Sequence, residues 1–173
     1  MNPFEVFKDA IKPFLDGKKP PLHVGEVMNL WFYLTGTQQT LRTDEVAYNI
    51  AQDAELKEKL KDIIEHEFGM EQFLRKEGVP LPPTTPEKPI SDYKDIPEGA
   101  KLTDEETANL LAYNLVIGIM SAARGFTEAV RPDVGMMFMK YQLTKATFGV
   151  TFKDLMQQRG WLKVPPYYVG NQQ

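Results

Sequence analysis

The chain has 173 residues, of which 42% are hydrophobic and 25% are charged, and its net charge is −4. This composition is typical of one globular domain, and the acidic balance argues against a protein that binds the nucleic-acid backbone, which requires a basic face. The absence of cysteine excludes disulfides, thiolate zinc sites and cysteine nucleophiles.

Residues 1–21 are predicted to form an N-terminal arm that contains a short helix. Its apolar residues recur at the spacing of one helix face and are Phe4, Phe7, Ile11 and Phe14. The arm either covers the core of its own chain or docks on another subunit. It lacks the basic start and the small-residue cleavage site of a secretory signal, so we expect an intracellular protein.

Residues 22–78 are predicted to form a first helical hairpin. Its first helix covers about 22–51, with apolar residues mostly on one stripe. Asp53 is placed to cap the second helix, which is predicted to run to Glu77 and to end at Gly78. Glycine is favoured there because it readily adopts the left-handed conformation that closes many helices.

Residues 79–103 contain six prolines and show no helical period. A structureless connection of this length is unusual inside a compact domain and needs a reason. If the second and third helices run parallel, the chain must return along a helix of ~35 Å, which an extended segment spans easily. One long crossover of this kind is the ferritin-like arrangement.

Residues 104–160 are predicted to form a second helical hairpin. Thr103 and Glu106 have the spacing of a capping box at the start of its first helix. This helix is apolar nearly all round, so we expect it to be the most buried element. Asp133 is a candidate cap for the last helix, which is predicted to end at Gly160.

Together these elements predict an all-α fold with a single domain over residues 1–173. The expected architecture is a ferritin-like four-helix bundle with one long crossover between helices two and three and a short N-terminal helix. The aromatic, proline-rich tail at 161–173 is expected to pack across the end of the bundle. No segment is apolar for long enough to predict a membrane span.

Bundles of this shape often hold two metal ions, but the ligands for such a site are missing here. A di-metal site needs Glu from two helices and Glu-x-x-His from the other two. No Asp, Glu or His occurs over Thr107–Thr127 or Val134–Lys153. His66 is the only histidine in a helix middle, and Ile63 stands three residues before it. The sequence therefore predicts no metal ligand, no cofactor site and no catalytic residue.

A candidate cluster of interior polar residues comprises Gln38, His66, Glu67 and Arg124. Glu67 falls between Ile63 and Met70 on the apolar stripe, where a carboxylate must find partners or take up a proton. The cluster is interpreted as structural, as a helix-edge position, or as part of a small-ligand pocket. His23 precedes Glu26 by three residues at a helix start, where we expect a solvated helix end.

Three motifs carry a resemblance to a known family. They are Leu-His-Val-Gly-Glu-Val-Met-Asn-Leu-Trp at 22–31, Gly-Val-Pro-Leu-Pro-Pro at 78–83 and Arg-Gly-Trp-Leu-Lys-Val-Pro-Pro-Tyr at 159–167. Over residues 22–168 the chain resembles an uncharacterised ferritin-like family of endospore-forming bacteria that is related to spore coat protein F. The resemblance implies action in the spore or its coat, without implying a reaction or any catalytic residue.

Two main hypotheses follow. The first is a non-catalytic structural or assembly protein of the spore coat, found in the mother-cell cytoplasm or in the coat itself. Its expected partners are a second copy, as a homodimer, or other coat proteins, with neither nucleic acid nor membrane. The alternative is a ferritin-like metal-binding oxidoreductase or small-ligand binder, with a pocket around Glu67, His66, Asn114 and Arg124. An intracellular dimer that senses a small apolar ligand is a third hypothesis.

Overall fold

The computed structural model describes residues 5, 9, 12, 19–64, 69–83 and 97–167. From residue 19 onward, the described chain contains five α-helices, one 3-10 helix and no strand, so the all-α prediction is confirmed. The elements are α2 (Val24–Ile50), α3 (Ala54–Ile64), α4 (Met70–Lys76), η2 (Glu98–Ala100), α5 (Asp104–Glu128) and α6 (Pro132–Gln158). The predicted N-terminal helix falls outside the described residues except at three single positions.

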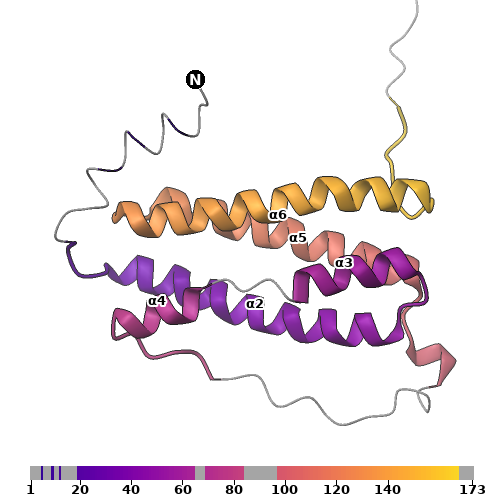
Figure 1. Cartoon of the computed structure of the whole chain (residues 1–173), viewed down its shortest axis with the longest axis horizontal. Coiled ribbons are helices and arrows are strands. Elements are labelled where there is room, and N and C mark those ends of the chain that lie inside the picture. The colour runs from indigo at the N-terminus through magenta and orange to yellow at the C-terminus, as the bar shows by residue number, and fades with distance from the viewer. Residues whose placement is uncertain are drawn as a thin grey trace, which may run out of the picture.

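The helices lie side by side along one long axis (Figure 1). At one end, Arg131 in the turn between α5 and α6 binds Glu77, which follows α4. At the other end, the backbone N–H of Asp53, between α2 and α3, donates to Asp104 at the start of α5, and Arg159 after α6 binds the Asp53 carboxylate. Helices α2 and α6 therefore run in one direction and α3, α4 and α5 in the other. The segment between α4 and α5 consequently joins opposite ends of the molecule.

Local sequence signals define several helix ends as predicted. The Thr103 hydroxyl accepts a hydrogen bond from the Glu106 N–H, and the Glu106 carboxylate accepts one from the Thr103 N–H, which is the predicted capping box. Asp53 caps α3 by accepting from the Leu56 N–H at 2.9 Å. Gly78 has a φ of +73°, as a left-handed residue after a helix requires.

The second helix of the first hairpin is interrupted, contrary to the prediction of one continuous helix up to Glu77. Helix α3 ends at Ile64 and α4 begins at Met70. Gly69 precedes α4 with a φ of +46°, a conformation that a residue without Cβ adopts at little cost. A periodic apolar stripe marks which face is buried, but it does not register where the backbone leaves the helix.

The core consists of two clusters of buried side chains. The cluster near the turn between α2 and α3 includes Leu56, Leu60, Leu111, Phe152 and Met156. The cluster toward the other end includes Leu30, Leu34, Leu74, Val134 and Phe138. In the tail, Trp161 and Leu162 pack against the first cluster, whereas residues 163–167 are exposed. The rest of the tail, 168–173, lies outside the described residues, so its predicted packing across the bundle end stays a prediction.

Helix α5 is not the most buried element, which corrects the sequence-based expectation. One face packs on α6 and α2 and contains its six buried residues, Thr107, Ala108, Leu111, Leu115, Ala122 and Gly125. The other face carries the exposed side chains of Leu110, Tyr113, Val116, Ile117 and Met120. Composition shows how apolar a helix is, but the number of neighbours that cover it depends on the tertiary arrangement.

Candidate functional site: a buried aspartate and lysine

The interior polar cluster predicted from the sequence is only partly described, because His66 and Glu67 lie outside the described residues. Gln38 lies in α2, and its side-chain amide donates a hydrogen bond to the Glu71 carboxylate at 2.9 Å. Arg124 lies near the end of α5, largely exposed, and pairs with a glutamate one turn further along at 2.8 Å. The two described members therefore have separate partners, and the structure does not bring them together.

Two other charged side chains face the interior. Asp44 of α2 is only 5% exposed, and it precedes the buried Ala47 and Ala51 by three and seven residues. Lys145 of α6 lies four residues after the buried Tyr141. Residues three, four or seven apart share one helix face, so both charged residues belong to the inward faces of their helices. The fold therefore brings an acid and a base to the centre of the molecule.

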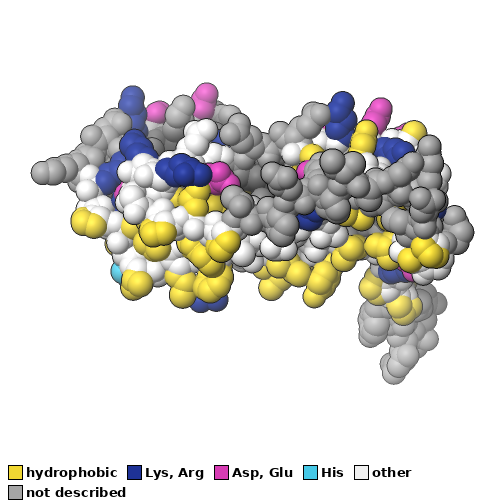
Figure 2. Space-filling model, turned by 90° about the horizontal axis from the view of Figure 1, so that it is seen from below, with side chains coloured by type: hydrophobic (Ala, Val, Ile, Leu, Met, Phe, Trp, Pro, Cys, Tyr) yellow, Lys and Arg dark blue, Asp and Glu magenta, His cyan; other side chains and the backbone are white. Residues whose placement is uncertain are grey.

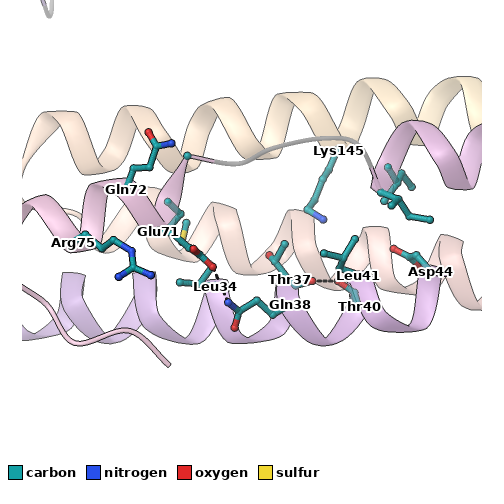
Figure 3. A pocket seen from close by; sticks show the side chains of 14 residues that line it. Leu34, Thr37, Gln38, Thr40, Leu41, Asp44, Glu71, Gln72, Arg75 and Lys145 are labelled. Atoms are coloured by element: carbon teal, nitrogen blue, oxygen red, sulfur yellow. Dashed lines mark hydrogen bonds between the residues drawn. The ribbon is translucent and has the colours of Figure 1, made fainter. Parts of the chain in front are cut away.

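Asp44 and Lys145 line an open cavity of about 420 Å³, whose other lining residues come from α2, α3, α4 and Gly69 (Figure 3). In this view the Lys145 side chain extends from α6 toward α2, and the Asp44 carboxyl group points into the same space. A smaller groove of about 160 Å³, on the side of α5, is also lined by both residues. Gly118 leaves room for the lysine there, because a Cβ at this position would lie 2.9 Å from Lys145 Cδ.

The protein environment shifts the ionisation of both groups. Burial raises the pKa of Asp44 from 3.8 to about 7, although the positive charge of Lys145 opposes this shift. Burial likewise lowers the pKa of Lys145, and the charge of Asp44 opposes that shift. Asp44 can therefore bind or release a proton near neutral pH, and its oxygens can accept from a small molecule in the cavity.

A pair of tyrosines lies beside these residues. The rings of Tyr33 and Tyr141 stack with their centroids 5.6 Å apart and their planes at 10°. Burial raises the pKa of both hydroxyls, that of Tyr141 to about 12, so both remain protonated at neutral pH. The Tyr33 hydroxyl is buried and has no hydrogen-bond partner within the described residues. Because Tyr33 also lines the smaller groove, it adds a polar group to the same region.

Glu26 is a second buried acid, located at the start of α2 and 1% exposed. Its carboxylate accepts hydrogen bonds from the backbone N–H groups of Val130 and Arg131, at 2.9 and 2.6 Å, and from the N–H of His23. The prediction of a solvated helix end holds for the exposed His23 and is wrong for Glu26. The turn between α5 and α6 closes over the carboxylate, and sequence spacing does not register that long-range contact.

Arg131 completes this network and is only 3% exposed. It donates two hydrogen bonds to Glu77, at 2.7 and 2.9 Å, and two to Asp133. The hydrogen bonds from Arg131 lower the pKa of Glu77. Burial would raise the pKa of Asp133, but the hydrogen bonds from Arg131 and Lys19 outweigh it and lower this pKa to about 2. Each charge is thus paired, and the network joins the ends of α2, α4, α5 and α6.

In the part of the chain that the structure describes, no three His, Cys, Asp or Glu side chains lie close enough together to hold a metal ion. Asp44 is a single carboxylate, and the nearby ammonium of Lys145 repels a cation. Among the described lining residues, Asp44 and Lys145 offer hydrogen-bonding groups that a small neutral or dipolar molecule could use.

Asp44 and Lys145 are the interior residues that sequence reasoning missed. The signal was present, because each is a charged residue at helical spacing from apolar residues that proved to be buried. It was weak for two reasons. A long lysine often reaches solvent from such a position, and an aspartate on an apolar stripe is equally consistent with the edge of the stripe.

Three comparisons relate this chain and its fold to known proteins. A family described as "Protein of unknown function (DUF3231)" matches residues 13–173. A Bacillus subtilis relative named "Uncharacterized protein YvdQ" is 32% identical over 153 residues, covering 86% of this chain and 90% of the relative. A crystal structure from Bacillus halodurans, of a protein named "putative spore coat protein", is similar with a TM-score of 0.81 and 30% identity, over 87% of this chain and 97% of that one.

The resemblance inferred from the three sequence motifs is thereby confirmed, since one structural neighbour from an endospore-forming Bacillus is named "putative spore coat protein". The family match covers nearly the whole chain, and the relative from Bacillus subtilis supports it. The chain belongs to the DUF3231 family.

Proposed function

We propose that the protein is a structural or assembly component associated with the spore coat, that it acts without a catalytic centre, and that its fold is a ferritin-like four-helix bundle. The name of the Bacillus halodurans neighbour supports the coat association. The directions of the described helices support the bundle, with α3 and α4 together acting as one of the four. Its partners are a second copy of the chain or other coat proteins.

The observation that carries this proposal is the use of charged side chains to join helix ends. At one end, the buried Arg131 pairs with Glu77 at 2.7 Å. At the other, Arg159 pairs with Asp53 and Glu55, both at 2.8 Å. Charges placed in this way hold the helices in a fixed arrangement, as a building block for packing requires.

Localisation during sporulation tests the proposal. A fluorescent fusion is expected to appear first in the mother-cell cytoplasm and then around the developing spore, and the protein should be extracted from purified spores with the coat fraction. Deletion of the gene is expected to alter coat thickness or layering in thin-section electron microscopy. A protein that is absent from purified spores, together with unchanged coat morphology in the deletion strain, would contradict the proposal.

A second candidate function, the binding of a small molecule in the interior, is favoured by the buried Asp44 carboxyl group beside a cavity of about 420 Å³. Native mass spectrometry of the purified protein tests it. A bound mass in the wild type that disappears in Asp44→Asn would support this function. Elemental analysis tests whether the bound species is a metal. Two iron or manganese ions per chain would favour a metal-binding oxidoreductase over a structural protein.

A further inference from the structure

Helix α5 combines the most apolar composition of the described helices with an exposed face. Contrary to the sequence-based expectation, α5 is long and apolar enough to cross a membrane, and it is the one such helix among the described residues. Only 22% of an apolar 18-residue window within it is buried. Large exposed apolar patches on a soluble protein mark sites of interaction. The contrast between composition and burial therefore indicates that another surface covers this face.

The exposed residues of α5 form a regular stripe, which we call the α5 stripe. Its members are Glu106, Leu110, Tyr113, Ile117, Met120 and Arg124. They are spaced by four, three, four, three and four residues, and each is exposed. This is the heptad spacing with which one helix packs lengthwise against another. The stripe is apolar in its middle, with an acidic residue at one end and a basic residue at the other.

Neighbouring apolar side chains of α2 widen this face. Phe32 of α2 and Ile117 of α5 line the same groove of about 160 Å³, and Met28 lies one turn before Phe32. Hydrophobic side chains gather along one long edge of the molecule in Figure 2. No charged residue occurs over 27–41 of α2 or 107–123 of α5, so these two helix segments bring no charge of their own to the middle of the face. Asp44 and Lys145 line the groove between them.

The size of the face fits a protein interface. Phe32 and Tyr113 are each 63% exposed, which corresponds to roughly 100–150 Å² apiece. With the five half-exposed aliphatic side chains Met28, Leu110, Val116, Ile117 and Met120, the face presents roughly 600–800 Å², close to the ~800 Å² per partner of a standard interface.

The charges at the ends of the α5 stripe favour one orientation of the partner, although Glu106 also accepts hydrogen bonds from Thr103 and Arg124 also pairs with Glu128. Two copies that pack their stripes antiparallel about a two-fold axis place Glu106 of one beside Arg124 of the other. The same register places Leu110 opposite Met120 and Tyr113 opposite Ile117. A parallel pair would instead bring like charges together at both ends. The stripe is thus complementary to itself in one orientation, as an interface between identical subunits requires.

A membrane surface fits the same face less well. Helices that lie on membranes carry Lys and Arg on their polar side, where these attract anionic lipids. Helix α5 instead begins with the three acidic residues Asp104, Glu105 and Glu106, and the whole chain has a net charge of −4. This balance would repel an anionic bilayer.

We infer that the α5 stripe, with the adjoining Met28 and Phe32 of α2, is the surface through which two copies of this chain form an antiparallel, two-fold symmetric dimer. The inference deepens the self-association proposed above by naming its surface and geometry. The two can fail separately. A monomeric protein that still locates to the coat would overturn the dimer alone, and a dimer that is absent from spores would overturn the coat assignment alone.

Light scattering after size exclusion of the full chain gives the first test. The wild type is expected at twice the chain mass of 19.8 kDa, and Ile117→Glu is expected at the monomer mass with an unchanged circular dichroism spectrum. Leu143→Glu, at a comparably exposed position on α6, is the matched control and should remain a dimer. A wild type that is monomeric at roughly 100 µM, well above the micromolar limit typical of such interfaces, would overturn the inference. So would a dimer that Ile117→Glu leaves intact.

A charge exchange tests the antiparallel register. Glu106→Arg and Arg124→Glu are each expected to weaken dimerisation by about tenfold, because each places like charges at both ends of the interface. The double variant restores opposite charges and should return to within about threefold of the wild type. Glu106→Arg and the double variant both lose the hydrogen bonds from Thr103 to the Glu106 carboxylate, so this loss cannot produce the rescue. A double variant that dimerises no more tightly than the weaker of the two single variants would overturn the antiparallel register.

Vesicle flotation completes the test. The wild-type chain is expected to remain in the soluble fraction with vesicles of zwitterionic or anionic phospholipid. A monomer that floats with either vesicle would assign the face to a membrane and overturn the dimer.

Discussion

Replacement of Asp44 by Asn isolates the effect of a buried acid on folding. Asn has nearly the same shape as Asp but cannot ionise, so the variant removes the charge and retains the packing of α2. Asp44 is 5% exposed, and burial raises its pKa from 3.8 to about 7. The carboxyl group therefore binds its proton more tightly in the folded protein than in the unfolded chain.

The direction of the pH dependence follows from this difference. The contribution of Asp44 to stability is fully present below about pH 4, is lost as the pH rises through about 7, and stays lost at higher pH. The shift from 3.8 to about 7, at about 1.36 kcal/mol per pH unit, sets an upper limit of roughly 4 kcal/mol. This shift already includes the attraction between Lys145 and the ionised Asp44, because the pKa of about 7 applies to the folded protein, in which both groups are present.

Urea unfolding of the wild type and Asp44→Asn, followed by circular dichroism between about pH 4 and pH 9, measures the effect. The two proteins should have similar unfolding free energies near pH 4, and the variant should be more stable by roughly 2–4 kcal/mol above about pH 8. Asp154→Asn, at an exposed position on α6, controls for the substitution itself. The unfolding free energy of the variant minus that of the wild type should therefore rise with pH. If this difference stays constant or falls, the ionised Asp44 does not destabilise the folded protein and the reasoning is refuted.

Two further predictions concern packing and the ion network. Gly125→Ala should destabilise the fold by roughly 1–3 kcal/mol, because a Cβ there would lie 2.6 Å from the fully buried ring of Phe138. Gly149→Ala in α6, which meets open space, should instead stabilise by about 0.5–1 kcal/mol, and equal effects of the two in thermal unfolding would contradict the described packing. Arg131→Met should cost roughly 3 kcal/mol in urea unfolding, because it leaves the Glu77 carboxylate without its partner. A loss below about 1 kcal/mol would show that this network contributes little.

The features that the sequence predicted well depend on neighbours close along the chain. The capping box of Thr103 and Glu106, the Asp53 cap and the left-handed Gly78 each need only a few residues to form. The family could also be inferred from sequence, because its motifs are short and continuous. The interruption of the second helix at Gly69 and the burial of Glu26 were not predicted from such local patterns.

The amino-acid sequence by itself determined that this chain is all-helical, where several of its helices begin and end, and which family it belongs to. Only the tertiary structure decided that Asp44 and Lys145 meet beside a cavity and that one apolar face of α5 is uncovered. The physical reason is the same in both cases. Periodicity assigns a residue to a face of its own helix, but which other helix lies over that face depends on contacts between segments far apart in the chain.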